Sequence, residues 1–88
     1  MITVQKNTDT TFTVTVEGHT VTKHNVTVPP SYYEKLTDGR VPSETLVQKS
    51  FEFLLERENN TSILRSFDLP VIAQYFPEYE RTIRKMLD

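Results

Sequence analysis

This 88-residue chain has no cysteine, no tryptophan and only two glycines, and it contains no long apolar run. Without cysteine, neither a disulfide nor a thiolate metal site can stabilise the fold, so stability must come from an apolar core or a partner subunit. The same absence favours the cytoplasm. Because no run approaches the roughly 20 apolar residues of a membrane-spanning helix, we expect no membrane association.

The scarcity of glycine argues against phosphate-binding loops. Gly18 and Gly39 stand far apart, whereas P-loop and Rossmann sites need several glycines in one loop so that backbone N–H groups converge on a phosphate. A Gly-x-Ser-x-Gly nucleophile motif is also absent. We therefore expect no cofactor, no catalytic residue and no small-molecule substrate, that is, a protein that is not an enzyme.

Charge and length point to one domain of balanced charge. Ten basic and twelve acidic residues give a formal net charge of −2, too balanced to indicate nucleic acid or a membrane surface on its own. The length fits a single domain over residues 1–88. Met1–Lys6 lack the charged start and apolar core of a signal peptide, so we expect none.

The chain changes period at Pro29-Pro30, which separates a β-hairpin region (1–28) from a helical region (31–88). Residues 11–17 alternate threonine with apolar residues, which predicts a strand with Phe12, Val14 and Val16 on one face. Residues 20–28 then form the returning strand. Residues 2–5 are the candidate for a third, shorter strand.

The turn sequence sets the expected strand register. Gly18-His19 predicts a two-residue type II′ turn, which places Val16 opposite Val21. An unbroken ladder would then set Phe12 against an asparagine, so we predict a β-bulge at residues 23–24 that restores Phe12 opposite Val26.

Helical spacing dominates the rest of the chain. Ser31 and Glu34 predict a capping box for a helix ending near residue 37, where Asp38-Gly39 stops it. Ser43 should cap the main helix, which we expect to reach about residue 58. Short helices are predicted over 63–66 and from a cap at 68 to 76, with a last helix over 77–87. The fold class is therefore α+β: an N-terminal antiparallel hairpin, three-stranded if residues 2–5 join, packed on four to five helices.

The predicted core lies between the hairpin and the main helix. Sheet residues should meet main-helix residues, with later apolar residues closing the sides. These residues are Phe12, Val14, Val16, Val26, Leu46, Phe51, Leu54, Leu64, Phe67, Ile72 and Ile83.

Three segments resemble short uncharacterised bacterial proteins. They are 26–33 (Val-Thr-Val-Pro-Pro-Ser-Tyr-Tyr), 64–70 (Leu-Arg-Ser-Phe-Asp-Leu-Pro) and 75–79 (Tyr-Phe-Pro-Glu-Tyr), within a likeness over about two thirds of the chain. In those proteins a strand–Pro-Pro–Tyr unit precedes a helix and a Phe-Asp-Leu-Pro…Tyr-Phe-Pro ending. The resemblance implies a bacterial, cytoplasmic origin. It carries no assigned activity, so it implies nothing about function.

Tyrosines are the leading functional candidates. Tyr32, Tyr33, Tyr75 and Tyr79 cluster near the Pro-Pro corner and the last helix, and tyrosine is enriched at interfaces because its body is apolar and its tip polar. The first hypothesis is a small protein-binding or self-assembly module, with a protein partner or homo-oligomer as dimer; exposed hairpin edges would also invite a second chain. The simpler alternative is that these rings form the half-buried edge of the core.

Nucleic-acid binding is the second hypothesis. Arg81, Arg84 and Lys85 form a basic strip on the predicted last helix, as a regulator that binds DNA or RNA would need. The strip is short and has acidic neighbours. The alternative is a helix end whose positive charges match the helix dipole.

Metal binding and acid–base chemistry have weaker candidates. His19 and His24 lie on the hairpin, and Asp9 and Glu17 are the acidic candidates for further ligands, but no spacing enforces three or four converging ligands. We expect no metal. The carboxylates at 52, 56 and 58 fit a solvated helix face better than a desolvated general acid.

Overall fold

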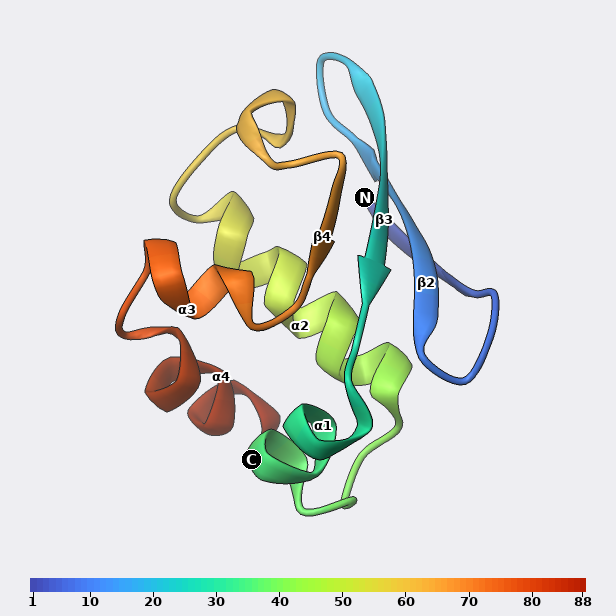
Figure 1. The fold of residues 1–88 in the computed structure, drawn as a ribbon. Coiled ribbons are helices and arrows are strands. Elements are labelled where there is room, and N and C mark those ends of the chain that lie inside the picture. Colours follow the sequence, from blue (N-terminus) through green and yellow to red (C-terminus); the bar gives the residue numbers. More distant parts are fainter.

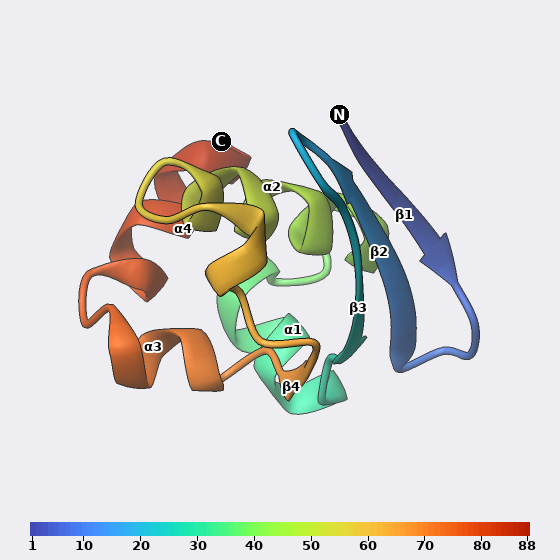
Figure 2. The same ribbon diagram turned by 90° about the horizontal axis from the view of Figure 1, so that it is seen from above.

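The computed structural model describes residues 1–88 and contains one four-stranded sheet with helices on one of its faces (Figure 2). The strands lie in the order β1 (Ile2–Lys6), β2 (Thr11–Glu17), β3 (Val21–Thr27) and β4 (Ser66–Asp68). The first three pair antiparallel, whereas β4 pairs parallel to β3. The α+β class is thus confirmed, the candidate strand near residues 2–5, which the sequence left open, is present, and the sheet is mixed rather than purely antiparallel.

Four α-helices and one short 3₁₀-helix make up the rest (Figure 1). They are α1 (Pro30–Thr37), α2 (Ser43–Leu55), the 3₁₀-helix η1 (Asn60–Ser62), α3 (Val71–Tyr75) and α4 (Tyr79–Leu87). The long helix α2 packs against the sheet, and α4 packs on α2 together with α1. None of these helices is long and apolar enough to span a bilayer.

The β2–β3 register keeps the predicted pairing of Phe12 with Val26, but not by the predicted route. The ladder is unbroken from Thr11–Thr27 to Glu17–Val21, so the turn has three residues, 18–20, and the expected β-bulge is absent. The bulge prediction was therefore wrong, because one extra turn residue supplies the same shift. The consequence is that Thr22 and His24 face the core, while Val21 faces solvent.

The segment after α2 differs most from the expectation. The helix predicted over 63–66 is absent, and residues 66–68 form β4 instead. Backbone bonds hold this segment beside β3: Asn25 N donates to the Arg65 carbonyl oxygen (2.8 Å), and Leu69 N donates to the Thr27 carbonyl oxygen (2.9 Å). These partners lie some forty residues apart in sequence, so local periodicity cannot reveal them.

The predicted C-terminal stop of α1 is present, whereas the predicted N-terminal side-chain caps are absent. Asp38 (φ 54°) and Gly39 (φ 72°) both take the left-handed conformation after α1, as the stop signal indicated. However, α1 starts at Pro30, α2 ends at Leu55, and no side-chain cap forms at either N-terminus. Helix α4 starts at Tyr79 rather than at residue 77. Proline before or at the first helical position fixes φ without any capping side chain.

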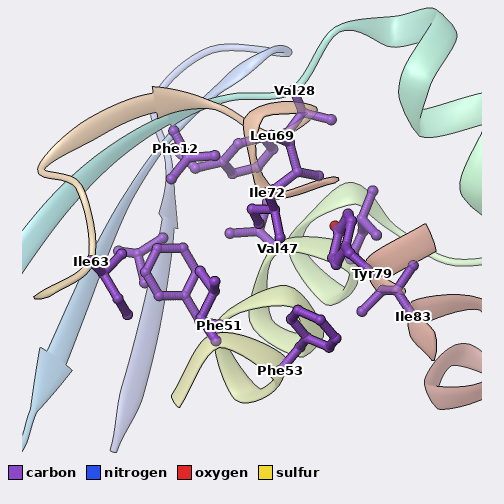
Figure 3. Packing of buried hydrophobic residues seen from close by; sticks show 14 of the residues in the cluster. Phe12, Val28, Val47, Phe51, Phe53, Ile63, Leu69, Ile72, Tyr79 and Ile83 are labelled. Atoms are coloured by element: carbon purple, nitrogen blue, oxygen red, sulfur yellow. The ribbon is translucent and has the colours of Figure 1, made fainter. Parts of the chain in front are cut away.

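The core sits where the sequence placed it, apart from two residues. All predicted core residues are buried except Phe67 and Leu64. Phe67 is half-buried, and the prediction for Leu64 was wrong, because this side chain is 47% exposed. Figure 3 shows Phe51 pointing from α2 toward the Ile63 side, while Phe53 points toward Tyr79 and Ile83. The ring centroids of Phe53 and Tyr79 lie 5.2 Å apart. One helix therefore joins the sheet to α4.

Candidate protein-binding surface

An apolar groove of about 390 Å³ opens between the end of α2, residues 58–64, β4 and α3. These are the segments that border the region between α2 and α3 in Figure 1. Eight of its ten lining residues are hydrophobic. The complete lining is Leu54, Glu58, Ser62, Ile63, Leu64, Phe67, Val71, Ile72, Tyr75 and Phe76. We call this surface the apolar groove.

Two apolar side chains on this groove extend into solvent. Leu64 is 47% exposed and Tyr75 is 66% exposed, and both belong to the few large hydrophobic residues that the fold leaves outside its core. By contrast, Ile63 and Ile72 form a buried floor. A buried apolar floor with an exposed apolar rim is typical of a surface that another molecule covers.

Residues 58–64 form one wall of the apolar groove, and a buried asparagine attaches this segment to the sheet. Asn60, 8% exposed, donates from Nδ2 to the Thr20 carbonyl oxygen (2.7 Å) and to Thr22 Oγ1 (3.0 Å), with the Val16 carbonyl oxygen at 3.4 Å. These acceptors belong to the end of β2, the turn and the start of β3. Asn60 therefore ties the segment after α2 to the hairpin end.

A buried histidine of β3 attaches the same wall to the sheet at a second point. His24 Nδ1 lies 2.7 Å from the Leu64 carbonyl oxygen, and its Nε2 lies 2.8 Å from Thr22 Oγ1. Because a carbonyl only accepts, Nδ1 carries the proton, and Nε2 accepts from the Thr22 hydroxyl. Burial lowers the pKa of His24 below 6.5, with the nearby Arg65 charge acting in the same direction and the Leu64 carbonyl opposing it. The neutral ring thus matches its surroundings.

The four candidate tyrosines occupy different environments and do not form one patch. Only Tyr75 is exposed. Tyr79 is fully buried, and its hydroxyl lies 2.6 Å from Ser50 Oγ, so it cannot contribute to a surface. Tyr32 and Tyr33 are half-buried and hydrogen-bonded within the fold, as the simpler alternative expected.

The Tyr32 hydroxyl donates to Glu80 Oε2 (2.8 Å), and Lys35 Nζ lies 3.2 Å from Glu80 Oε1. The Tyr32 hydrogen bond, followed by the Lys35 bond and charge, lowers the pKa of the Glu80 carboxyl. Burial and the same hydrogen bond raise the pKa of the Tyr32 hydroxyl. This cluster joins α1 to α4 and gives both tyrosine and carboxylate a structural role.

The basic strip lies on α4 and is exposed. Arg81, Arg84 and Lys85 all face solvent, and none of them forms an ion pair. Arg84 Nη2 donates to the Lys35 carbonyl oxygen (3.3 Å), which places that guanidinium at the end of α1. Glu80 interrupts the strip on the same helix.

The metal and acid–base candidates remain apart. No group of three or more histidine, cysteine or acidic side chains lies close enough to hold a metal ion. His19 is exposed in the turn, whereas both ring nitrogens of His24 are already hydrogen-bonded. Glu52 pairs with Lys49 (3.5 Å) on the surface of α2, and Glu58 lines the apolar groove.

Sequence reasoning missed Leu64 as part of this surface and Asn60 as the residue that attaches its wall to the hairpin. The sequence places Asn60 in a corner between helices and Leu64 in the core, because both predictions assume a helix directly after that corner. The pair of polar residues Thr22 and His24 is the signal that would have revealed these hydrogen bonds. A three-residue turn directs both side chains inward, where they require polar partners.

Comparison with protein-family models, with curated proteins and with solved structures gave no match. Geometry alone therefore guides the functional proposal.

Proposed function

We propose that this protein is a small, non-enzymatic binding module whose apolar groove receives apolar side chains of another polypeptide. One observation carries the proposal: Leu64 and Tyr75, with exposures of 47% and 66%, both stand on the groove. Tyrosine and large aliphatic anchors that fit hollows supply most of the binding energy at protein interfaces. The cytoplasmic setting indicated by the lack of cysteine belongs to the same proposal.

The lining also limits the chemistry of the partner. Glu58 is the one carboxylate in the groove wall, and Ser62 the other polar residue. A partner segment that presents two or three apolar side chains with a lysine or arginine beside them would satisfy both the floor and Glu58. We therefore expect an apolar, locally basic segment as the ligand.

The test compares groove variants with a surface control. Leu64→Ser and Tyr75→Ser remove the two rim side chains, whereas Val21→Ser removes an apolar residue of intermediate exposure (59%) at the hairpin end. Tagged versions of all three and the wild type are used to capture proteins from the native cell. The recovered protein is then purified and its Kd is measured by calorimetry.

We expect one protein to bind the wild type and Val21→Ser equally and to lose at least tenfold in affinity with each groove variant, since a central anchor contributes about 2 kcal/mol or more. Equal binding by all four proteins, or capture of nothing that binds directly, contradicts the proposal.

Nucleic-acid binding remains the alternative, because Arg81, Arg84 and Lys85 are exposed and free of ion pairs. The test is fluorescence anisotropy with labelled DNA and RNA at low salt. This alternative expects affinity that falls steeply with salt and is lost in Arg81→Ala/Arg84→Ala, while Lys23→Ala/Arg65→Ala, which removes the same charge elsewhere, still binds. Absence of binding at low salt eliminates it.

A further inference from the structure

We infer that β1 is a self-pairing edge, along which two copies of this chain join antiparallel so that their sheets become continuous. This edge lies at the opposite border of the sheet from β4, which lines the apolar groove, so the inference is independent of what the groove binds. Figure 2 shows β1 at the border of the sheet, with no helix beyond it and only the β1–β2 loop at its end.

The hydrogen-bond pattern shows which main-chain groups are available. Glu17 N donates to the Met1 carbonyl oxygen (2.9 Å), and Asn7 N donates to the Thr11 carbonyl oxygen (2.9 Å). In an antiparallel pair, inward-bonding residues alternate with outward-facing ones. The N–H and C=O groups of Ile2, Val4 and Lys6 therefore point away from β2, at an edge where no other strand pairs.

The two borders of the sheet differ in how they resist such pairing. The β4 border has three residues and is followed at once by Leu69 and Pro70. The β1 border has five residues in an unbroken ladder with β2, and contains neither proline nor bulge. Its one charged residue is Lys6, at the end of the strand. Natural edge strands usually carry several protective features, and β1 has little of this protection.

The strand is also complementary to itself, which is why we assign a second copy as the occupant. A two-fold axis at Val4 pairs Val4 with the second copy's Val4, and Ile2 with the second copy's Lys6, so every outward N–H meets an outward C=O. Ile2 and Val4 are half-buried on the helical face, where each would gain apolar cover. On the polar face, Thr3 meets the second copy's Gln5.

This register can be tested by disulfide trapping, because the chain has no cysteine of its own. Thr3 and the second copy's Gln5 would form a non-hydrogen-bonded pair with Cα atoms about 4.5 Å apart, within disulfide reach. Thr3→Cys and Gln5→Cys proteins are prepared separately and mixed in a glutathione redox buffer. We expect the mixed disulfide dimer to dominate over both homodimers by at least tenfold. Statistical proportions of the three dimers, or no cross-link, overturn the inference.

A second experiment needs no cysteine. Val4→Pro removes an outward N–H and leaves the β1–β2 bonds in place, whereas Val4→Thr keeps the N–H and the side-chain shape. Sedimentation equilibrium should show a dimer for wild type and Val4→Thr and a monomer for Val4→Pro, with amide spectra confirming that β1 stays folded. Leu64→Ser/Tyr75→Ser should remain dimeric. A monomeric wild type, or a dimer lost only in the groove variant, contradicts self-pairing at β1.

Discussion

Two segments are attached to the three N-terminal strands of the sheet, and different forces hold them there. Helix α2 is held by apolar packing, with Phe51 fully buried at its centre. The segment from residue 60 to 68 packs through Ile63 and Phe67 but also depends on directional bonds: Asn60 and His24 provide the polar contacts, and β4 pairs with β3 over three residues. The attachment of α2 therefore rests on apolar contacts alone, whereas one wall of the apolar groove also needs a few polar groups.

The ring of Phe51 in α2 contacts residues that belong to both attachments. Phe51 lies 5.3 Å from the His24 ring and 6.0 Å from the Phe67 ring, measured between centroids. Its packing therefore supports both segments. Apolar packing is insensitive to pH, whereas a hydrogen-bonded histidine is not. A change of pH should thus separate the two segments in a way that a core truncation cannot.

The largest effect is expected for Phe51→Ala. Truncating this fully buried ring should lower the free energy of unfolding by about 3–5 kcal/mol, through lost transfer energy and the cavity that remains. Urea denaturation measures this value, and Phe51→Leu, which keeps most of the volume, should lose clearly less. A loss below about 1 kcal/mol for the alanine variant would mean that α2 does not anchor the sheet.

Asn60→Ala should have the next largest effect. It removes the donor of the buried Thr22 hydroxyl and the stronger donor of the part-buried Thr20 carbonyl oxygen, which costs about 1–3 kcal/mol. The exposed neighbour Asn59 provides the matched control, because Asn59→Ala removes the same side chain outside the network. Equal denaturation midpoints for the two variants would show that the tie does not stabilise the fold.

Acid should weaken the His24 attachment before it affects the scaffold. The folded pKa of His24 lies below the unfolded value of 6.5, so just below pH 6.5 the unfolded chain binds more protons. The stability from this ring is thus present above pH 6.5 and is lost as the pH falls toward the folded pKa, by at most about 1.4 kcal/mol per pH unit. His24→Gln should abolish that slope between pH 7.5 and 5.5. An unchanged slope in the variant would assign it to other groups.

The smallest effect is expected for Leu64→Ser. Because Leu64 is largely exposed and only its carbonyl oxygen takes part in the tie, the free energy of unfolding should change by no more than about 0.5 kcal/mol. Thermal denaturation is sufficient to detect a larger loss. A loss comparable to that of Asn60→Ala would mean that the Leu64 side chain is structural and that its effect on binding is indirect.

The sequence predicted the parts of the fold that depend on local pattern. Alternation over residues 11–17 and helical spacing from residue 43 were sufficient for β2, α2 and the contact of Phe12 with the helical layer, because each pattern reports one face. The left-handed stop at Asp38-Gly39 was equally local.

The rest depends on contacts between residues far apart in the chain. The third turn residue, Thr20, shifts the register so that His24 points inward, where the Leu64 carbonyl oxygen accepts its hydrogen bond and Asn60 donates to the neighbouring Thr22. Tyr75 and Tyr79 look alike in sequence, yet one is exposed and the other buried, because the break between α3 and α4 resets the helical face. The sequence therefore identified one residue of the candidate surface, Tyr75, from its residue type. The other residues that line the apolar groove could be found only from the structure.

The central claim is that a neutral His24, bonded through Nδ1–H to the Leu64 carbonyl oxygen, holds the groove wall on the sheet. Long-range ¹H–¹⁵N imidazole spectra over a pH titration test it directly. We expect the Nδ1–H tautomer, still neutral at pH 6.5, and backbone shifts of residues 60–65 that move together with this ring at lower pH while those of α2 stay in place. A His24 ring that is half-protonated at pH 6.5, or that carries its proton on Nε2, would contradict the account.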